Sequence, residues 1–335
     1  MTYHPSCSDC FYYDITQGEQ TPTVGAEAEA VFDASCDAQI LQHALKDDLD
    51  KDAIINVLTK RTNHQRLKIA AEFKKLCGKD LISELKKKLS GDFKKLMVAL
   101  VKRPADFLAK ELHHAVGGIG TDEKTLVEII CTATNFQLDC IKAAYEKKYG
   151  KTLAEDVADD TSGSFRRLLV SLLCACRPEC ECVNEEDVCQ DVSDLIAAGL
   201  GSKSDEKSIF NKILCTRSYD HLRRVFQQYR HVAQCSLEEA IEEEFSGDLK
   251  IGMLAIVYSV GHKSAFFAER LHDAISRIGT NDRKLIRIVV SRCEVDMFDI
   301  KQEYKKCYHK SLEEDVAEDT SGHYRKALLS LIGDC

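Results

Sequence analysis

Glycine-containing loops in this chain are followed, forty residues later, by an acidic side chain. The clearest example begins at Val116 and reads VGGIGTDE, and Asp160 lies forty residues beyond Gly120. Glycines let a chain turn tightly with its backbone carbonyls facing outward. A hard cation such as Ca²⁺ takes six to eight oxygen ligands from carbonyls, carboxylates and waters. Three loop carbonyls and one distant carboxylate would supply part of that shell and leave positions open.

The same residues also fit a purely structural role. A glycine can end one helix in a left-handed conformation, and Thr121 can cap the start of the next. Taken alone, this loop does not decide between a cation site and a pair of helix caps. Recurrence elsewhere in the chain separates the two hypotheses.

The pairing recurs twice and is lost once. ISRIGT starts at Ile275, with Asp319 forty residues after Gly279, and GLGSKSDE starts at Gly199, with Glu244 forty residues after Ser204. The earliest counterpart, KDDLD from Lys46 to Asp50, has no glycine, and Lys88 stands forty residues after Asp48. Loop and carboxylate are therefore lost together. A two-part ligand set predicts that joint loss, whereas independent caps have no reason to fail together.

These pairs belong to a larger internal repeat. An apolar helical stretch recurs four times, and thirty-odd residues after each comes a Ser-Gly pair followed by another apolar helix. Apolar residues recur at i, i+3, i+4 and i+7, and no strand-like alternation persists, which predicts an all-α protein. We expect an N-terminal tail, residues 1–32, that lies outside the core. Four repeats should follow at residues 33–104, 105–178, 190–261 and 262–335, with a Cys-rich linker, residues 179–189, between the second and the third.

Composition narrows the function. Lys+Arg 46 against Asp+Glu 55 gives −9, and seven acids precede the first basic residue, Lys46, so the remainder is nearly neutral. Such a body is a poor match for nucleic acid. The apolar runs are about half the roughly 20 residues of a membrane span, and the N-terminus lacks the features of a signal peptide, which favours a cytoplasmic location. The 16 cysteines are then expected as reduced thiols, with oxidation of Cys180 or Cys182 outside the cell as the alternative.

Other chemistry fits poorly. Asp48, Asp50 and Asp52 resemble the start of an EF-hand, but Ala53 replaces the required glycine and Thr59 the final glutamate. The Gly-Ser-Lys-Ser run from Gly201 lacks the order and preceding strand of a phosphate-binding loop. No His-Glu-x-x-His or Gly-x-Ser-x-Gly sequence occurs, and we expect no enzymatic activity.

With its four repeats, G-x-G-T-D/N loops, D-T-S-G signatures and longer central linker, the chain resembles the annexin family over most of its length. The resemblance implies four homologous five-helix repeats arranged as a curved disc, with calcium loops on the convex face. It also implies Ca²⁺-dependent, reversible binding to acidic, phosphatidylserine-like phospholipid membranes. Backbone carbonyls and one carboxylate per repeat would be the ligands: Val116, Gly118, Gly120 and Asp160; Ile275, Arg277, Gly279 and Asp319; Gly199, Ser202, Ser204 and Glu244.

Departures from the family pattern rank these sites. Lys88 puts a positive charge where a carboxylate belongs, so repeat one should lack its main calcium site. Arg277 and Ser204 replace glycines, which should make the backbone bend harder, and we rank repeat two first, repeat four second and repeat three third. The chain has no Trp, and Lys203 occupies a position where relatives can show one, which leaves ion bridging as the main membrane contact. The alternative is a calcium-independent scaffold that binds protein partners through its acidic tail.

Overall fold

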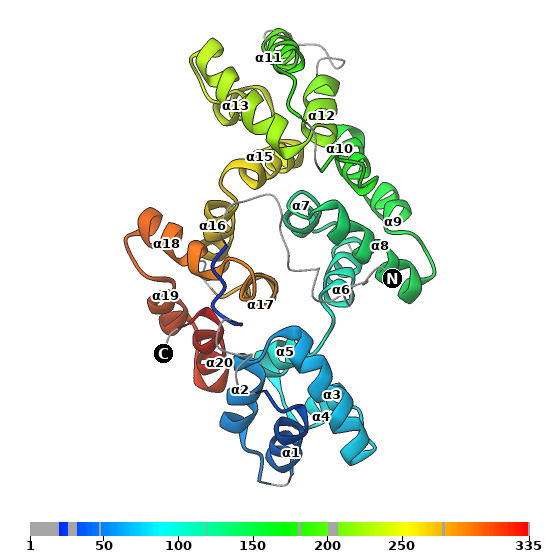
Figure 1. The fold of residues 1–335 in the computed structure, drawn as a ribbon, viewed down its shortest axis with the longest axis vertical. Coiled ribbons are helices and arrows are strands. Elements are labelled where there is room, and N and C mark those ends of the chain that lie inside the picture. Colours follow the sequence, from blue (N-terminus) through cyan, green and yellow to red (C-terminus); the bar gives the residue numbers. More distant parts are fainter. Residues whose placement is uncertain are drawn as a thin grey trace. The chain divides into compact units, whose positions relative to one another are not determined.

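The computed structural model describes residues 20–25, 32–46, 48–118, 120–179, 182–199, 207–276 and 279–333. These residues form twenty α-helices and no strand, which confirms the all-α class (Figure 1). None of the helices in these ranges combines the length and apolar character needed to cross a membrane.

The helices fall into four groups of five along the chain, one group for each repeat. Repeat one contains α1 (Ala34–Ala44), α2 (Lys51–Lys60), α3 (Asn63–Cys77), α4 (Leu81–Lys88) and α5 (Gly91–Leu100). Repeat two contains α6 (Pro104–Val116), α7 (Glu123–Ile130), α8 (Asn135–Tyr149), α9 (Leu153–Asp160) and α10 (Gly163–Leu173).

The second half of the chain repeats this order. Repeat three contains α11 (Glu185–Gly199), α12 (Lys207–Thr216), α13 (Tyr219–Ala233), α14 (Leu237–Glu244) and α15 (Gly247–Gly261). Repeat four contains α16 (Lys263–Ile275), α17 (Asp282–Arg292), α18 (Met297–Tyr308), α19 (Leu312–Asp319) and α20 (Gly322–Ile332). Two compact units result: residues 1–107 with 267–335, and residues 108–266.

Local sequence explains where individual helices begin and end. The N-cap Thr62 of α3 accepts a hydrogen bond from the backbone of Gln65, whose side chain accepts from the Thr62 backbone in return. Such a capping box satisfies two amide groups that the first turn leaves unpaired. Gly78 ends α3 in the left-handed region, at φ +67°, where only glycine is unstrained. The same devices bound α8 in repeat two, between Thr134 and Gly150.

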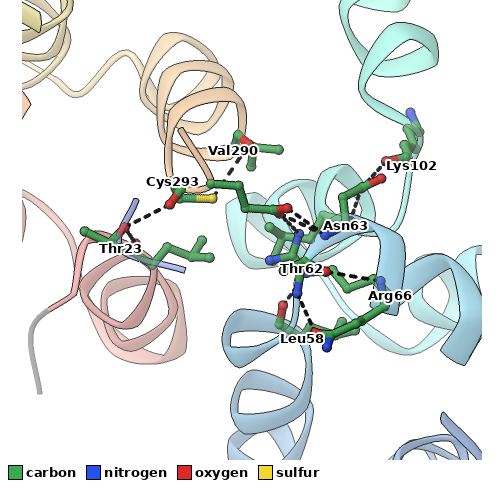
Figure 2. Close-up of polar contacts among 12 residues, drawn as sticks. Thr23, Leu58, Thr62, Asn63, Arg66, Lys102, Val290 and Cys293 are labelled. Carbon is green, nitrogen blue, oxygen red and sulfur yellow. Dashed lines mark hydrogen bonds and ion pairs between the residues drawn. The ribbon is translucent and has the colours of Figure 1, made fainter. Parts of the chain in front are cut away.

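Within the first unit, repeats one and four share a buried polar junction (Figure 2). The guanidinium of Arg66 pairs with Glu294 at 2.8 Å, and both side chains are almost fully buried. The backbone N–H of Asn63 donates to the same carboxylate at 2.8 Å. Burial raises the pKa of Glu294, against the opposing effect of Arg66. Removal of either partner would leave a buried charge without its counterion. The pair therefore holds α3 against the residues that follow α17.

Part of the predicted tail packs into the first unit. Both Thr23 and Val24 donate backbone hydrogen bonds to the carbonyl of Cys293 at 3.0 Å, and the Thr23 hydroxyl donates to Leu331 at 2.6 Å. The Val24 side chain is buried in the core. The expectation that residues 1–32 lie outside the core is therefore wrong for Val24. The apolar Val24 can pack there because its own backbone N–H and the polar groups of Thr23 bond to carbonyls at the ends of α17 and α20.

The linker between repeats two and three lies earlier in the chain than expected: residues 174–184 separate α10 from α11, whereas the predicted linker was 179–189. Helix α11 begins at Glu185, so residues 185–189 of the predicted linker are helical. Three acids in the first turn of α11 favour that start, because they complement the positive end of the helix dipole. The side chains of Cys174, Cys176, Cys182 and Cys189 are exposed thiols, and Cys180 lies outside the described residues.

Candidate calcium sites

The loop between α6 and α7 is closed by one backbone hydrogen bond. Asp122 donates its N–H to the carbonyl of Ala115 at 2.9 Å and then caps α7 through its side chain. Six residues, 116–121, lie between these two anchors. No backbone hydrogen bond from a described residue ends on the carbonyls of Val116, Gly118 or Gly120, so these oxygens are available to a cation. Gly120 has φ +87°, a conformation that favours glycine.

The backbone at Gly118 is less demanding than the sequence suggests. Its φ lies outside the left-handed region, and an added Cβ would lie 3.5 Å from the Gly120 carbonyl oxygen, an ordinary contact. In repeat two, a non-glycine residue at this position would therefore not hinder the bend. Arg277, the counterpart of Gly118 in repeat four, lies outside the described residues.

The Asp160 carboxylate is brought to this loop from the end of α9. The Thr121 hydroxyl donates to Asp160 Oδ2 at 2.7 Å and lies 2.9 Å from the Asp160 carbonyl oxygen. This contact fixes one carboxylate oxygen and leaves the other free to bind an ion. The structure thus brings together the loop and the acid that the forty-residue spacing had paired.

Repeat four reproduces the arrangement. Asn281 donates its N–H to the carbonyl of Ala274 at 2.8 Å, again with six residues between the anchors, and caps α17. Gly279 has φ +88°, and the Thr280 hydroxyl donates to the Asp319 carboxylate. Ile275 ends α16 with a buried side chain, which holds the first predicted carbonyl donor in place.

The three predicted acidic ligands lie at the carboxyl ends of helices, where a negative charge is unfavourable for the helix. Asp160, Glu244 and Asp319 are the last residues of α9, α14 and α19, and none of these helices has a basic residue in its last turn. A negative charge at the carboxyl end of a helix opposes the helix dipole, by roughly 0.3–1 kcal/mol. Helix stability therefore does not explain these residues, whereas a ligand role does.

A partly buried side-chain relay links the loop helix α6 to the carboxylate helix α9. His113, three residues before Val116, contacts the Tyr145 hydroxyl through Nδ1 at 3.1 Å. That hydroxyl donates to Asp156, four residues before Asp160, at 2.5 Å. Burial and the bond to Asp156 raise the pKa of Tyr145, so it stays a donor. Hydrogen bonds from Lys151 and Tyr145 outweigh burial and lower the pKa of Asp156.

The same relay exists in repeat four, formed by His272, Tyr304 and Asp315. A second tyrosine stacks on each histidine, Tyr149 on His113 and Tyr308 on His272, with ring centroids 3.7 Å apart. The relay was not predicted from the sequence. The signal was present, because all four residue types recur at the same offset as the calcium loops.

Repeat three can be described only in part. Gly199 ends α11, and Glu244 ends α14 with an exposed side chain. The predicted donors Ser202 and Ser204 lie outside the described residues. Tyr229 takes the place of Tyr145 in the internal repeat, but Ala240 stands where the relay has Asp156.

Repeat one differs in the loop as well as in the charge. Asp50 donates its N–H to the carbonyl of Ala44 at 3.0 Å, and only five residues, 45–49, lie between these anchors. The side chain of Leu45 is buried, and the ammonium of Lys46 contacts His43 Nδ1 at 3.3 Å. A loop that is one residue shorter and contains no glycine cannot present the same carbonyl set.

The donor chemistry suits calcium better than a transition metal. Among the residues the structure describes, no group of three or more His, Cys, Asp or Glu side chains could hold a metal ion. The candidate sites depend instead on carbonyl oxygens and one carboxylate each. Hard oxygen donors of this kind suit Ca²⁺, which accepts irregular geometry and retains waters or external ligands.

Comparison with known proteins agrees with the four repeats. The sequence model of the annexin family matches residues 36–100, 107–172, 190–256 and 266–331. Rabbit (Oryctolagus cuniculus) annexin A11 is 46% identical over 303 residues, which cover 90% of this chain and 60% of the relative. Rat (Rattus norvegicus) annexin A5 is 45% identical over 303 residues, covering 90% of this chain and 95% of the relative. The chain thus spans about 60% of the length of annexin A11 but nearly all of annexin A5.

Solved structures show the same fold. Annexin III superposes with a TM-score of 0.90 at 40% identity, covering 96% of this chain and 99% of that one. Calcium-bound annexin (Sm)1 superposes with a TM-score of 0.87 at 30% identity, covering 97% and 96%. The chain therefore belongs to the annexin family, whose members are generally non-enzymatic proteins that bind phospholipids in a calcium-dependent manner.

Proposed function

We propose that this protein binds acidic, phosphatidylserine-like membranes reversibly through Ca²⁺ held in repeats two and four, with repeat three as a weaker third site. The observation that carries the proposal is the paired geometry of Thr121 with Asp160 and of Thr280 with Asp319. In both repeats an open carbonyl loop meets a carboxylate at an unfavourable helix end. A solved relative, annexin (Sm)1, is calcium-bound, which supports calcium as the ion.

The ligand sets follow the family pattern residue by residue. In repeat two the carbonyls of Val116, Gly118 and Gly120 would act with Asp160. The corresponding sets are Ile275, Arg277, Gly279 and Asp319 in repeat four, and Gly199, Ser202, Ser204 and Glu244 in repeat three. When bound, Ca²⁺ supplies a positive bridge that a lipid phosphate or carboxylate can share.

This chain's own groups determine how weakly and how cooperatively the bridge forms. One carboxylate per site gives low affinity for the free ion, because calcium affinity rises with ligand charge and site rigidity. A headgroup that completes the coordination then raises the affinity for the ion, and the ion raises the affinity for the headgroup by the same factor. Several loops on one surface add through effective concentration. Binding to a membrane is therefore expected to be steep in calcium and reversible on its removal.

Cosedimentation with phosphatidylserine vesicles tests the proposal. The wild type should pellet in calcium and return to the supernatant with a chelator. Asp160→Asn/Asp319→Asn keeps an acceptor for each threonine but removes both charges. It should raise the calcium needed for half-maximal binding at least as much as loss of an outer-shell partner, roughly 10–100-fold.

A matched control removes two neighbouring charges. Asp159→Asn/Glu318→Gln changes the preceding residue of each helix, where the exposed acids pair with Lys151 and Lys310. This control should bind like the wild type. At about 0.15 M salt, binding that persists in chelator, or an equal loss in both double variants, would reject the proposed calcium bridge.

A further inference from the structure

The last turn of α4 ends in three consecutive lysines, whereas the matching turns of the other three repeats end in two or three acids and contain no basic residue. Lys86 and Lys87 are exposed, and neither forms an ion pair with any residue in the described ranges. Lys88, half-buried, occupies the position of the ligand carboxylate in the other repeats. The charge at this corner is therefore reversed, and two of the three ammonium groups face solvent.

The charge reversal extends over residues 79–95, which contain α4 and the start of α5 and form the basic corner of repeat one. These residues hold six lysines and three acids, a net charge of +3. The corresponding stretches 151–167, 235–251 and 310–326 have net charges of −1, −5 and −2. Repeat one is thus the only one of the four whose corner is attractive to an anion in the absence of a bound cation.

This basic corner adjoins the calcium loop of repeat four within the first unit. The lysines lead directly into α5, which packs against α17 and α20. Asp92 in the first turn of α5 is close enough to Asp282, the first residue of α17, to raise its pKa after the larger effect of burial. Asp282 in turn lies two residues beyond Thr280, whose hydroxyl binds Asp319. A membrane that meets the repeat-four loop is therefore within reach of the lysines.

We propose that the last turn of α4 is a calcium-independent contact for an anionic phospholipid surface, in which Lys86 and Lys87 meet headgroup phosphates beside the repeat-four loop. This inference rests on the proposed function, because it concerns the same membrane. Each lysine near an anionic leaflet contributes about 1 kcal/mol, or about fivefold in affinity, within a screening length. Such a contact is weak alone, but it would pre-orient the protein and lower the calcium needed by the neighbouring loop.

The test uses phosphatidylserine vesicles in chelator at about 0.01 M ionic strength, where charges act over about 30 Å. The wild type should bind weakly, should not bind pure phosphatidylcholine vesicles, and should lose binding at about 0.15 M salt. Lys86→Glu/Lys87→Glu should reduce the chelator-resistant binding by at least tenfold, and Lys86→Gln/Lys87→Gln should reduce it less. Lys68→Glu/Lys74→Glu makes the same charge change at two exposed lysines of α3, outside residues 79–95, and should stay within about twofold of the wild type.

The alternative is that the lysines only stabilise α4, since basic residues in a last turn favour the helix dipole. Equal binding of the two charge-reversed variants, or no chelator-resistant binding by the wild type, would overturn the inference. Asp160→Asn/Asp319→Asn separates this result from the proposed function. It should keep binding in chelator and need roughly 10–100-fold more calcium for its calcium response. Lys86→Glu/Lys87→Glu should lose binding in chelator and still bind when calcium is added, so each variant retains one kind of binding that shows it is folded.

Discussion

Repeats one and two place opposite charges on the same framework. Helix α4 ends in Lys88 and α9 ends in Asp160, although both helices have eight residues and lead into a helix that starts with a left-handed glycine. The loop opposite α9 has six residues between its anchors and contains glycines, whereas the loop opposite α4 has five and none. Charge, loop length and backbone freedom have changed together. The comparison teaches that the proposed calcium site is a composite of loop and carboxylate, and that the five-helix repeat persists where both are changed.

The largest effect should come from giving repeats two and four the lysine that repeat one carries at the position of the ligand carboxylate. Asp160→Lys/Asp319→Lys places an ammonium group where each ion would bind, so calcium-dependent pelleting with phosphatidylserine vesicles should be lost over the whole accessible calcium range. Chelator-resistant binding at low salt should increase instead, because residues 151–167 change from −1 to +1 and residues 310–326 from −2 to neutral. Retention of a normal calcium response by this variant would break the comparison.

The reverse conversion should succeed only in two steps. Lys88→Glu alone should leave the calcium dependence unchanged within about twofold, because the shorter loop cannot supply its carbonyls. Replacing residues 45–49 by the six-residue sequence VGGIGT in the same variant should add a site and lower the calcium needed for half-maximal binding. Calorimetric titration with calcium and vesicles would count the sites. A new site from Lys88→Glu alone would show that loop length is irrelevant.

A smaller effect is expected from the relay between the loop and carboxylate helices. Tyr145→Phe/Tyr304→Phe removes both hydroxyls that bridge histidine and aspartate, and should weaken calcium-dependent binding by about tenfold, the lower end for an outer-shell partner. Tyr229→Phe in repeat three is the control, since Ala240 replaces the aspartate there. If Tyr229→Phe weakens binding as much as Tyr145→Phe/Tyr304→Phe does, the tyrosines contribute through packing alone. Vesicle titrations at fixed lipid provide the measurement.

The smallest effect concerns stability without calcium. Asp160→Asn should raise the free energy of unfolding in chelator by about 0.3–1 kcal/mol, because it removes a negative charge from the carboxyl end of α9. Lys87→Gln should lower it by a similar or smaller amount, because the lysine stands favourably at the end of α4. Denaturant unfolding of both variants checks the signs. A destabilised Asp160→Asn would mean that the carboxylate serves the helix rather than an ion.

Much of the architecture could be predicted from periodicity and spacing. The recurrence of apolar helices gave the four repeats, and the forty-residue interval paired Gly120 with Asp160, which the structure brings together through Thr121. Those features depend on local sequence and on one constant interval. They could be predicted because each repeat folds around its own buried helix faces.

Other features depend on contacts that no interval reveals. The shorter loop of repeat one became evident only from the bond between Asp50 and Ala44. The junction of Arg66 with Glu294 joins residues 228 apart, and the docking of Val24 depends on backbone groups that any sequence offers. The proximity of α5 to the repeat-four loop likewise follows from packing between the first and last repeats. Long-range packing decides these features, and short-range patterns do not encode it.

The most direct test of the central claim is a crystal structure of the full chain grown in calcium, with the ions located by anomalous scattering. The account predicts an ion bound by Asp160 and the carbonyls of Gly118 and Gly120, and a second bound by Asp319 and Gly279. It predicts none between residues 45–49 and Lys88. An ion in repeat one, or none in repeats two and four, would contradict it.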